Sequence, residues 1–208
     1  MIAQVLANGG HLGFDTYKEY LWLKNEGVKY APDLIMVVFF FNDATRMPVD
    51  TVIKQTYTES VARSQSRSRL YKFLKYRYLR KIVSERTLEA YQAPYFMGER
   101  GFFDHCKDSI LKIKQLAEEN KAELLFVIFP MLIDLDDDYT FQNVHDLVSN
   151  FLKENDIRTH SLLPAFLDYE GSDDSLWINL LDSHPNEKGN AIAADALYQY
   201  FINSDLLN

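Results

Sequence analysis

The residues whose types and spacing best suit chemistry are Asp182 and His184. They stand two positions apart, in what we expect to be a loop just before a C-terminal helix. An imidazole oriented by a carboxylate can act as a general base and remove a proton from a hydroxyl group. Taken alone, the pair is equally consistent with a histidine that only caps or packs against the following helix. Its role therefore depends on which other residues lie beside it.

Two further clusters place polar residues directly after apolar segments. Asn8-Gly9-Gly10, with Gly13 close behind, follows the apolar segment Ile2 to Ala7, and Asn42-Asp43 follows the apolar run Leu34 to Phe41. Glycines after a strand allow the backbone to turn and to approach a ligand closely. The alternative for both clusters is an ordinary turn with no chemical role.

The apolar patterns around these clusters alternate between strands and helices. Short apolar runs predict strands at 2–7, 34–41, 123–129 and 157–160, and helical spacing predicts helices at 16–26, 104–120, 141–154 and 191–201. The continuous run 34–41 is typical of a strand that is buried on both faces of a parallel sheet. The order of the elements predicts an α/β doubly wound fold with a parallel sheet, in which ligands bind outside the carboxyl ends of the strands. The three polar clusters lie at such places.

Taken in order, the three clusters resemble the sequence blocks of the SGNH/GDSL hydrolase family. Asn8-Gly9-Gly10 looks like the second block, and Pro32-Asp33 with the following strand and Asn42-Asp43 looks like the third. Asp182 to Asn186, with Gly189, looks like the fourth block, which is the most specific of them. The resemblance spans nearly the whole chain outside a central insertion, and it implies a three-layer α/β/α flavodoxin-like fold.

The resemblance also implies a mechanism, which is serine catalysis on ester bonds without a cofactor. His184 would take the proton from a serine hydroxyl, and Asp182 would hold the imidazole in the right tautomer and stabilise its charged form. The Gly10 amide and the Asn42 side chain would donate hydrogen bonds to the oxyanion. Acetylated sugars, lipids and small acyl esters all fit as substrates, and an O-acyltransferase of the same fold fits as well as an esterase or lipase.

Three features depart from the family pattern. Phe40 stands where the family has a glycine two residues before Asn42, and we expect it to narrow the site or reshape the turn. Asp182 lies two rather than three positions before His184. The largest departure concerns the nucleophile, because the family carries it in a Gly-Asp-Ser segment ahead of the second block. Only seven residues precede Asn8 here, and none of them is a serine.

The resemblance therefore predicts that the first strand and its serine are not part of this polypeptide. In the flavodoxin-like order that strand lies between the second and the third, so its loss leaves an unfilled slot or displaced pairing. We expect an N-terminally shortened hydrolase. The rival prediction is a non-catalytic fragment or pseudo-enzyme that keeps the fold for binding or assembly.

Composition and charge indicate a single domain, residues 1–208, with an insertion at 46–103 that includes one or two helices. The net charge of −8 argues against a general nucleic-acid binder. Residues 63–86 nevertheless hold nine lysines or arginines and one acid, which makes this segment +8. We expect an amphipathic helix at 67–86 that lies over the domain, and an anionic lipid or acidic polysaccharide surface is the alternative.

Other sequence features exclude several classes of site. No apolar run reaches about 18 residues and the chain does not begin like a signal peptide, so neither a membrane span nor a location is predicted. The single cysteine, Cys106, cannot form an internal disulfide. The histidines are scattered, which predicts no metal cluster.

Two further segments have structural interpretations. Asp134, Asp136 and Asp138 imitate the start of a calcium loop, but the required glycine and glutamate are missing, so we expect a solvated loop. The aromatic segment Tyr91 to Phe96 predicts packing of the insertion on the core, with the lining of an acyl or sugar pocket as the alternative. The oligomeric state is not predicted.

Overall fold

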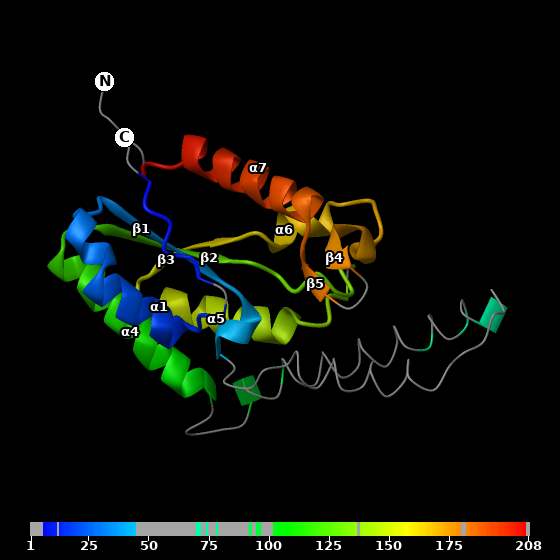
Figure 1. Ribbon diagram of the computed structural model, residues 1–208, viewed down its shortest axis with the longest axis horizontal. Helices are drawn as coiled ribbons and strands as arrows, with labels where there is room; N and C mark the ends of the chain where they lie inside the picture. The colour runs from blue at the N-terminus through cyan, green and yellow to red at the C-terminus, as the bar shows by residue number, and fades with distance from the viewer. Residues whose placement is uncertain are drawn as a thin grey trace.

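The computed structural model describes residues 6–11, 13–44, 102–136, 138–179 and 182–206, together with residues 70, 71, 74, 78, 92, 95 and 96. These residues form a mixed α/β fold around a parallel sheet (Figure 1). The elements follow in the order α1 (Thr16–Asn25), η1 (Gly27–Tyr30), β1 (Leu34–Phe39), η2 (Phe41–Ala44), α4 (Phe102–Glu119), β2 (Glu123–Ile128), α5 (Gln142–Glu154), β3 (Arg158–Ser161), α6 (Leu163–Leu167), η3 (Asp173–Leu176), β4 (Trp177–Asn179), β5 (Asp182–Pro185) and α7 (Glu187–Asn203). The prediction of an α/β fold with a parallel sheet is confirmed.

The main sheet has three strands in the order β1-β2-β3, and both pairings are parallel. The register places Phe39 beside Ile128 and Ile128 beside Ser161. The carboxyl ends of the three strands therefore lie next to one another, and they define the edge at which a site is expected. The strands predicted at 34–41, 123–129 and 157–160 correspond to β1, β2 and β3 to within two residues.

Strand β1 is buried on one face only. Ile35, Val37 and Phe39 are buried, whereas Met36 and Val38 are each 42% exposed. The expectation that this run is buried on both faces is therefore wrong. The reason is its position, because β1 is an edge strand among the described residues, while β2 lies between two neighbours and has residues 125–128 fully buried.

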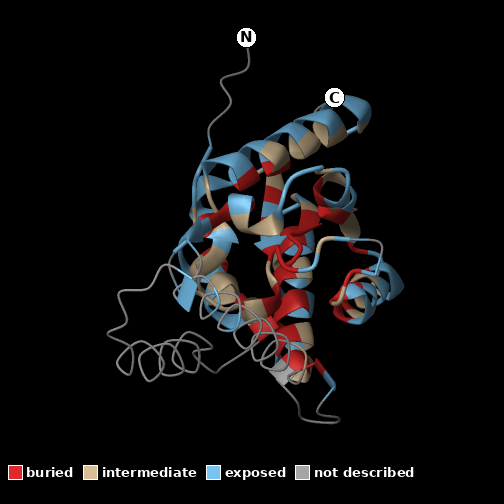
Figure 2. Ribbon diagram, turned by 90° about the vertical axis from the view of Figure 1, so that its right-hand side faces the viewer, coloured by how far each residue is buried: buried red, intermediate tan, exposed pale blue. Residues whose placement is uncertain are grey.

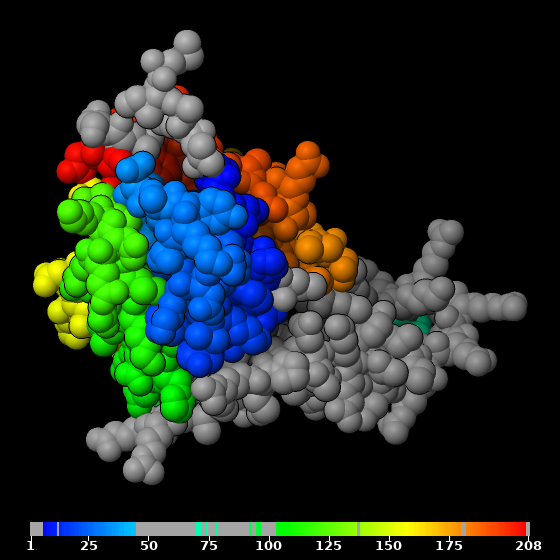
Figure 3. Space-filling model, turned by 60° about the vertical axis from the view of Figure 1, so that its left-hand side comes forward, coloured from blue at the N-terminus to red at the C-terminus, as the bar shows by residue number. Residues whose placement is uncertain are grey.

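Helices cover the sheet from both sides, with α1, α4 and α5 on one side and α7 on the other (Figure 1). The buried residues gather between these layers (Figure 2). On the outside, α1 and α4 lie side by side (Figure 3). The spacing of four residues between Val144, Val148 and Leu152 explains how α5 presents one apolar stripe to the core.

Helix α7 begins earlier than the sequence pattern indicates. The expected start at Ala191 is four residues too late, because the helix begins at Glu187. Asn186 caps it by accepting hydrogen bonds from the backbone amides of Lys188 and Gly189 at 2.9 and 3.1 Å. The cap precedes the apolar pattern of the helix, so periodicity alone does not reveal the first turn.

The hairpin of β4 and β5 is absent from the sequence-based prediction. The two strands pair antiparallel, with Trp177 beside Pro185 and Asn179 beside Asp182. Asp182 and His184 therefore stand on a short strand rather than in the loop that we expected. Strands of three and four residues are too short to show a hydrophobic period.

Several expectations fall largely outside the described residues. These are the insertion at 46–103, the basic helix at 67–86 and residues 2–5 of the expected first strand. Leu6 and Ala7 are described and are not in a strand.

Tyr95 of the aromatic segment is described and is buried, and its hydroxyl donates to the carbonyl of Phe41 at 2.7 Å, so this residue packs on the core. Among the helices that the structure describes, none has both the length and the apolar character needed to cross a bilayer.

Candidate active site

His184 and Asp182 are joined by two hydrogen bonds. Nδ1 of His184 lies 2.5 Å from Oδ1 of Asp182, and the backbone amide of His184 donates to the same oxygen at 3.1 Å. Residues two apart on a strand project to the same side, which explains how the short spacing still permits direct contact. Both side chains are partly exposed, His184 at 47% and Asp182 at 40%.

The contact with Asp182 decides which nitrogen of His184 is available for chemistry. A carboxylate only accepts hydrogen bonds, so Nδ1 carries a proton, and in the neutral imidazole the lone pair is then on Nε2. In the part of the chain that the structure describes, Nε2 has no hydrogen-bond partner. This is the arrangement that a general base needs when a hydroxyl group approaches it.

The segment after His184 is held rigidly. The side-chain amide of Asn186 donates to the carbonyls of Ser175 and Trp177 at 2.9 Å each. Gly189 packs so closely that an added Cβ would lie 3.0 Å from the Cβ of Pro185. The asparagine and glycine of this block therefore position the pair and explain why these residue types stand there.

Phe40 brings the pair to the carboxyl end of β1. Its ring stacks on the imidazole of His184, with ring centroids 5.9 Å apart and an interplanar angle of 26°. Phe40 follows β1 directly, and Asn42 lies two residues farther along in η2. The structure thus gathers Asp182, His184 and the segment that carries Asn42, although they are about 140 residues apart in sequence.

Hydrogen bonds between Phe40 and Asp43 close the turn that contains Asn42. The amide of Phe40 donates to Oδ2 of Asp43 at 2.7 Å, and the amide of Asp43 donates to the carbonyl of Phe40 at 2.9 Å. Burial raises the pKa of Asp43 well above its usual value, and the nearby Glu19 raises it further. We interpret Asp43 as a structural part of the turn.

Glu19 is the partner of Asp43 in this buried acidic group. Burial, together with the charge of Asp15, raises the pKa of Glu19 to about 7. Its Oε2 atom is buried, and no group of the described residues forms a hydrogen bond with it. Two buried carboxyl groups that lie near each other repel when both are ionised. At least one of them therefore holds a proton at neutral pH.

Gly10 stands on a separate segment, and its amide is already paired. The amide donates to the side-chain oxygen of Asn8 at 2.9 Å. Beside it, Gly9 lies against Trp22 of α1, where an added Cβ would be 2.4 Å from the ring, and Gly13 has a positive φ of 76°. Packing and backbone conformation thus account for Gly9 and Gly13, whereas an oxyanion role for Gly10 requires its bond to Asn8 to break.

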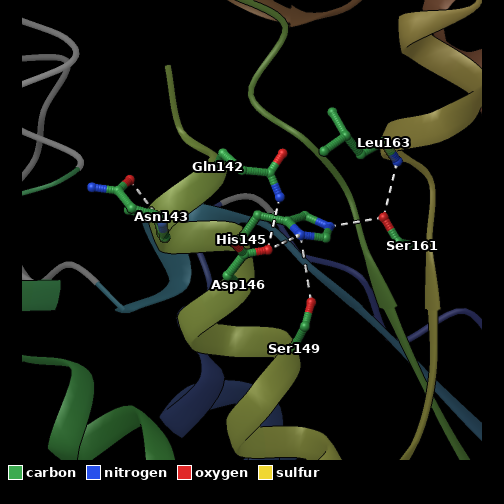
Figure 4. A network of polar contacts seen from close by, with 8 residues as sticks. Gln142, Asn143, His145, Asp146, Ser149, Ser161 and Leu163 are labelled. Carbon is green, nitrogen blue, oxygen red and sulfur yellow. Dashed lines mark hydrogen bonds and ion pairs between the residues drawn. The ribbon is translucent and has the colours of Figure 1, made fainter. Parts of the chain in front are cut away.

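A histidine–serine pair links α5 and β3 (Figure 4). Nε2 of His145 is 2.8 Å from Oγ of Ser161, and Nδ1 is 3.5 Å from Oγ of Ser149 and 3.8 Å from Asp146. His145 is only 8% exposed, and burial lowers its pKa. Oγ of Ser161 also accepts the amide of Leu163 at 3.1 Å. We interpret this network as a link between α5, β3 and α6, which the sequence pattern does not reveal.

Other chemistry-bearing groups lie away from the pair. A polar cavity of about 270 Å³ lies between α1, η2 and α4, and its lining includes neither Asp182 nor His184. Burial raises the pKa of Cys106 in its wall to about 12, which keeps the thiol protonated and unreactive.

Within the described ranges, no group of three or more histidine, cysteine or acidic side chains is placed to hold a metal ion. Asp134, Asp136 and Asp138 are exposed in a loop.

Comparisons with known proteins identify no relative of this chain. No family model, no curated protein and no solved structure matches the chain. The chemistry of the site is therefore inferred from its own residues and their geometry.

Proposed function

We propose that this chain is the body of an SGNH-type serine hydrolase that acts on ester bonds, with the serine supplied by polypeptide that precedes the 208 residues. One observation carries the proposal, which is the Asp182–His184 pair stacked on Phe40 at the carboxyl end of a parallel strand. Asn42 stands two residues beyond that stacking contact.

The proposed reaction follows from the hydrogen bonds of the pair. Nε2 of His184 takes the proton of the serine hydroxyl while the serine oxygen attacks the ester carbonyl, and Asp182 stabilises the imidazolium that forms. The oxyanion accepts hydrogen bonds from Asn42 and Gly10. His184 then returns the proton to the departing alcohol, and a water molecule repeats the sequence to release the acid.

One edge of β1 has no strand partner among the described residues, and this supports the proposal of an additional strand. The carbonyls of Asp33 and Phe39 accept hydrogen bonds from the β2 side, at 2.8 and 2.9 Å. Backbone groups alternate along a strand, so those of Met36 and Val38 point to the opposite edge, which has no strand partner among the described residues. An unpaired edge with exposed apolar side chains favours association with a further strand. Such a strand would end beside Phe40 and His184.

The rival function is a binding domain without catalysis. Two observations favour it for the chain as it stands: Nε2 of His184 has no hydroxyl partner in the described residues, and the Gly10 amide is paired with Asn8. In the proposed complete enzyme, a preceding segment supplies the hydroxyl partner of Nε2, and the oxyanion displaces Asn8 from the Gly10 amide.

The experiment compares p-nitrophenyl acetate hydrolysis by three proteins: this chain, the chain extended through its upstream coding sequence, and the extended chain with His184→Ala. We expect activity in the extended protein and a loss of about 10²–10⁴-fold or more with His184→Ala. His105→Ala, which removes an exposed histidine on α4, is the matched control and should leave the rate unchanged.

Several outcomes would contradict the proposal. These are the absence of an in-frame Gly-Asp-Ser coding segment upstream of Met1, or an inactive extended protein that is folded. Activity of the present chain that disappears with His184→Ala would place the nucleophile within these residues and overturn the missing-strand part. Added alcohol as a competing acceptor separates hydrolysis from acyl transfer.

A further inference from the structure

The ring of Phe40 contacts both the candidate base and a ring of the hydrophobic core. It stacks on His184, with ring centroids 5.9 Å apart and an interplanar angle of 26°. It also meets the ring of Phe129 at 6.1 Å and 60°, and Phe129 in turn contacts Phe166 at 5.2 Å. Phe129 and Phe166 are buried. The partly exposed imidazole therefore lies on an aromatic surface that is backed by the core.

The backbone of Phe40 is also fixed. Its amide donates to Oδ2 of Asp43, and its carbonyl accepts the amide of Asp43. These two hydrogen bonds hold the Cα atom of Phe40 at the end of β1, while the contact with Phe129 restricts its side chain. Because both the backbone and the side chain of Phe40 are restrained, its ring can support the imidazole ring of His184.

His184 needs such a support because its other restraints are few. The bond from Nδ1 to Asp182 fixes one point of the imidazole and leaves rotation about that contact open. Asp182 is itself partly exposed, at 40%. Stacking on a fixed plane removes the remaining freedom, and it determines the direction in which Nε2 points.

We infer that Phe40 is a positioning residue that holds the imidazole of His184 in its reactive orientation. A catalytic role for this contact rests on the proposed function. The stacking of Phe40 on His184 can nevertheless be tested in a protein that shows no enzyme activity. This role also gives a physical reason for a large aromatic side chain two residues before Asn42, where the family pattern has a glycine.

The test uses the chain as it stands and follows His184 alone. The first measurement is the rate at which diethyl pyrocarbonate modifies His184, read peptide by peptide, with the exposed His11 and His105 as internal references. The second is the position of the His184 ring-proton signals in an NMR spectrum, which the Phe40 ring displaces by its ring current. Phe40→Leu removes the ring at similar volume, whereas Phe40→Tyr keeps it.

We expect Phe40→Leu to raise the modification rate of His184 by about two- to tenfold, the factor that corresponds to the loss of one aromatic pair. The ring-proton signals should move toward unstacked positions. Phe40→Tyr should restore both readouts. Phe129→Leu keeps the Phe40 ring and removes only one of its restraints, so it should change both readouts less than Phe40→Leu does.

The inference is overturned if Phe40→Leu leaves both readouts unchanged in a folded protein, or if Phe40→Tyr or Phe129→Leu changes them as much. In the extended, active protein, Phe40→Leu should lower kcat and leave KM nearly unchanged. A stacked His184 in a protein without esterase activity would refute the proposed function alone. Full activity with an unstacked His184 would refute the role of Phe40 alone.

Discussion

The amide of Gly10 donates a 2.9 Å hydrogen bond to the side-chain oxygen of Asn8, so the backbone donor expected in an oxyanion hole is paired before any substrate arrives. A neutral hydrogen bond of this kind contributes about 0.5–1.5 kcal/mol net. An oxyanion is a stronger acceptor than an amide oxygen, because charged acceptors form shorter and stronger hydrogen bonds. In the proposed reaction, the oxyanion intermediate would therefore displace Asn8 from Gly10.

Asn8→Ala tests this relationship directly. We expect the Gly10 amide to exchange its hydrogen about two- to tenfold faster, since that factor corresponds to the loss of one such bond. In the extended, active protein, kcat should not fall, because the substitution removes only a competitor for the amide. Asn8→Asp keeps an acceptor and serves as the control. A large loss of activity with Asn8→Ala would mean that Asn8 itself acts on the substrate.

The raised pKa of Glu19 predicts a pH dependence of stability. Burial raises this pKa from 4.5 to about 7, so between these pH values the folded chain keeps a proton that the unfolded chain releases. The free energy of unfolding therefore falls as the pH rises through this window, by up to about 3 kcal/mol. The stabilisation is fully present below pH 4.5 and is lost as the pH passes about 7. Asp43, whose pKa is also raised by burial, contributes in the same direction.

Glu19→Gln should remove this part of the dependence. Urea unfolding from pH 4.5 to 8 should show a flatter profile for the variant, and above pH 7 the variant should be more stable than the parent chain. The exposed Glu154→Gln is the control and should reproduce the parent profile. A variant curve parallel to that of the parent would show that Glu19 does not titrate in this range.

The contact between Ser161 and His145 predicts a stability effect without a catalytic one. Ser161→Ala leaves Nε2 of the buried His145 and the amide of Leu163 without their partner, which should cost about 1–3 kcal/mol of unfolding free energy. Ser149→Ala removes only a 3.5 Å contact and should cost much less. If Ser161→Ala abolished esterase activity in a folded protein, this pair rather than His184 would be the reactive one.

Close packing of Gly189 predicts that even alanine is unfavourable there. An added Cβ would lie 3.0 Å from Pro185 Cβ and 3.2 Å from the backbone oxygen of Leu176. We expect Gly189→Ala to lower the unfolding free energy by about 1–3 kcal/mol, although alanine is the better helix former. Thermal unfolding measures this difference. A stabilised variant would show that the start of α7 can move away from Pro185 without cost.

Much of the fold follows from the sequence alone. The continuous apolar runs and helical spacings predict β1, β2 and α5 closely, because these elements are long enough to show a period. The short distance between Asp182 and His184 is likewise a local property, since residues two apart on a strand point the same way. The α/β class and the residues of the pair could therefore be predicted from the sequence.

Only the tertiary structure decided what surrounds that pair. The stacking of Phe40 on His184 joins residues 144 positions apart, and no local pattern encodes such a contact. The exposure of Met36 and Val38 depends on which strands lie beside β1. Periodicity reports whether a segment has an apolar face, but neighbours that are distant in sequence determine whether that face is covered.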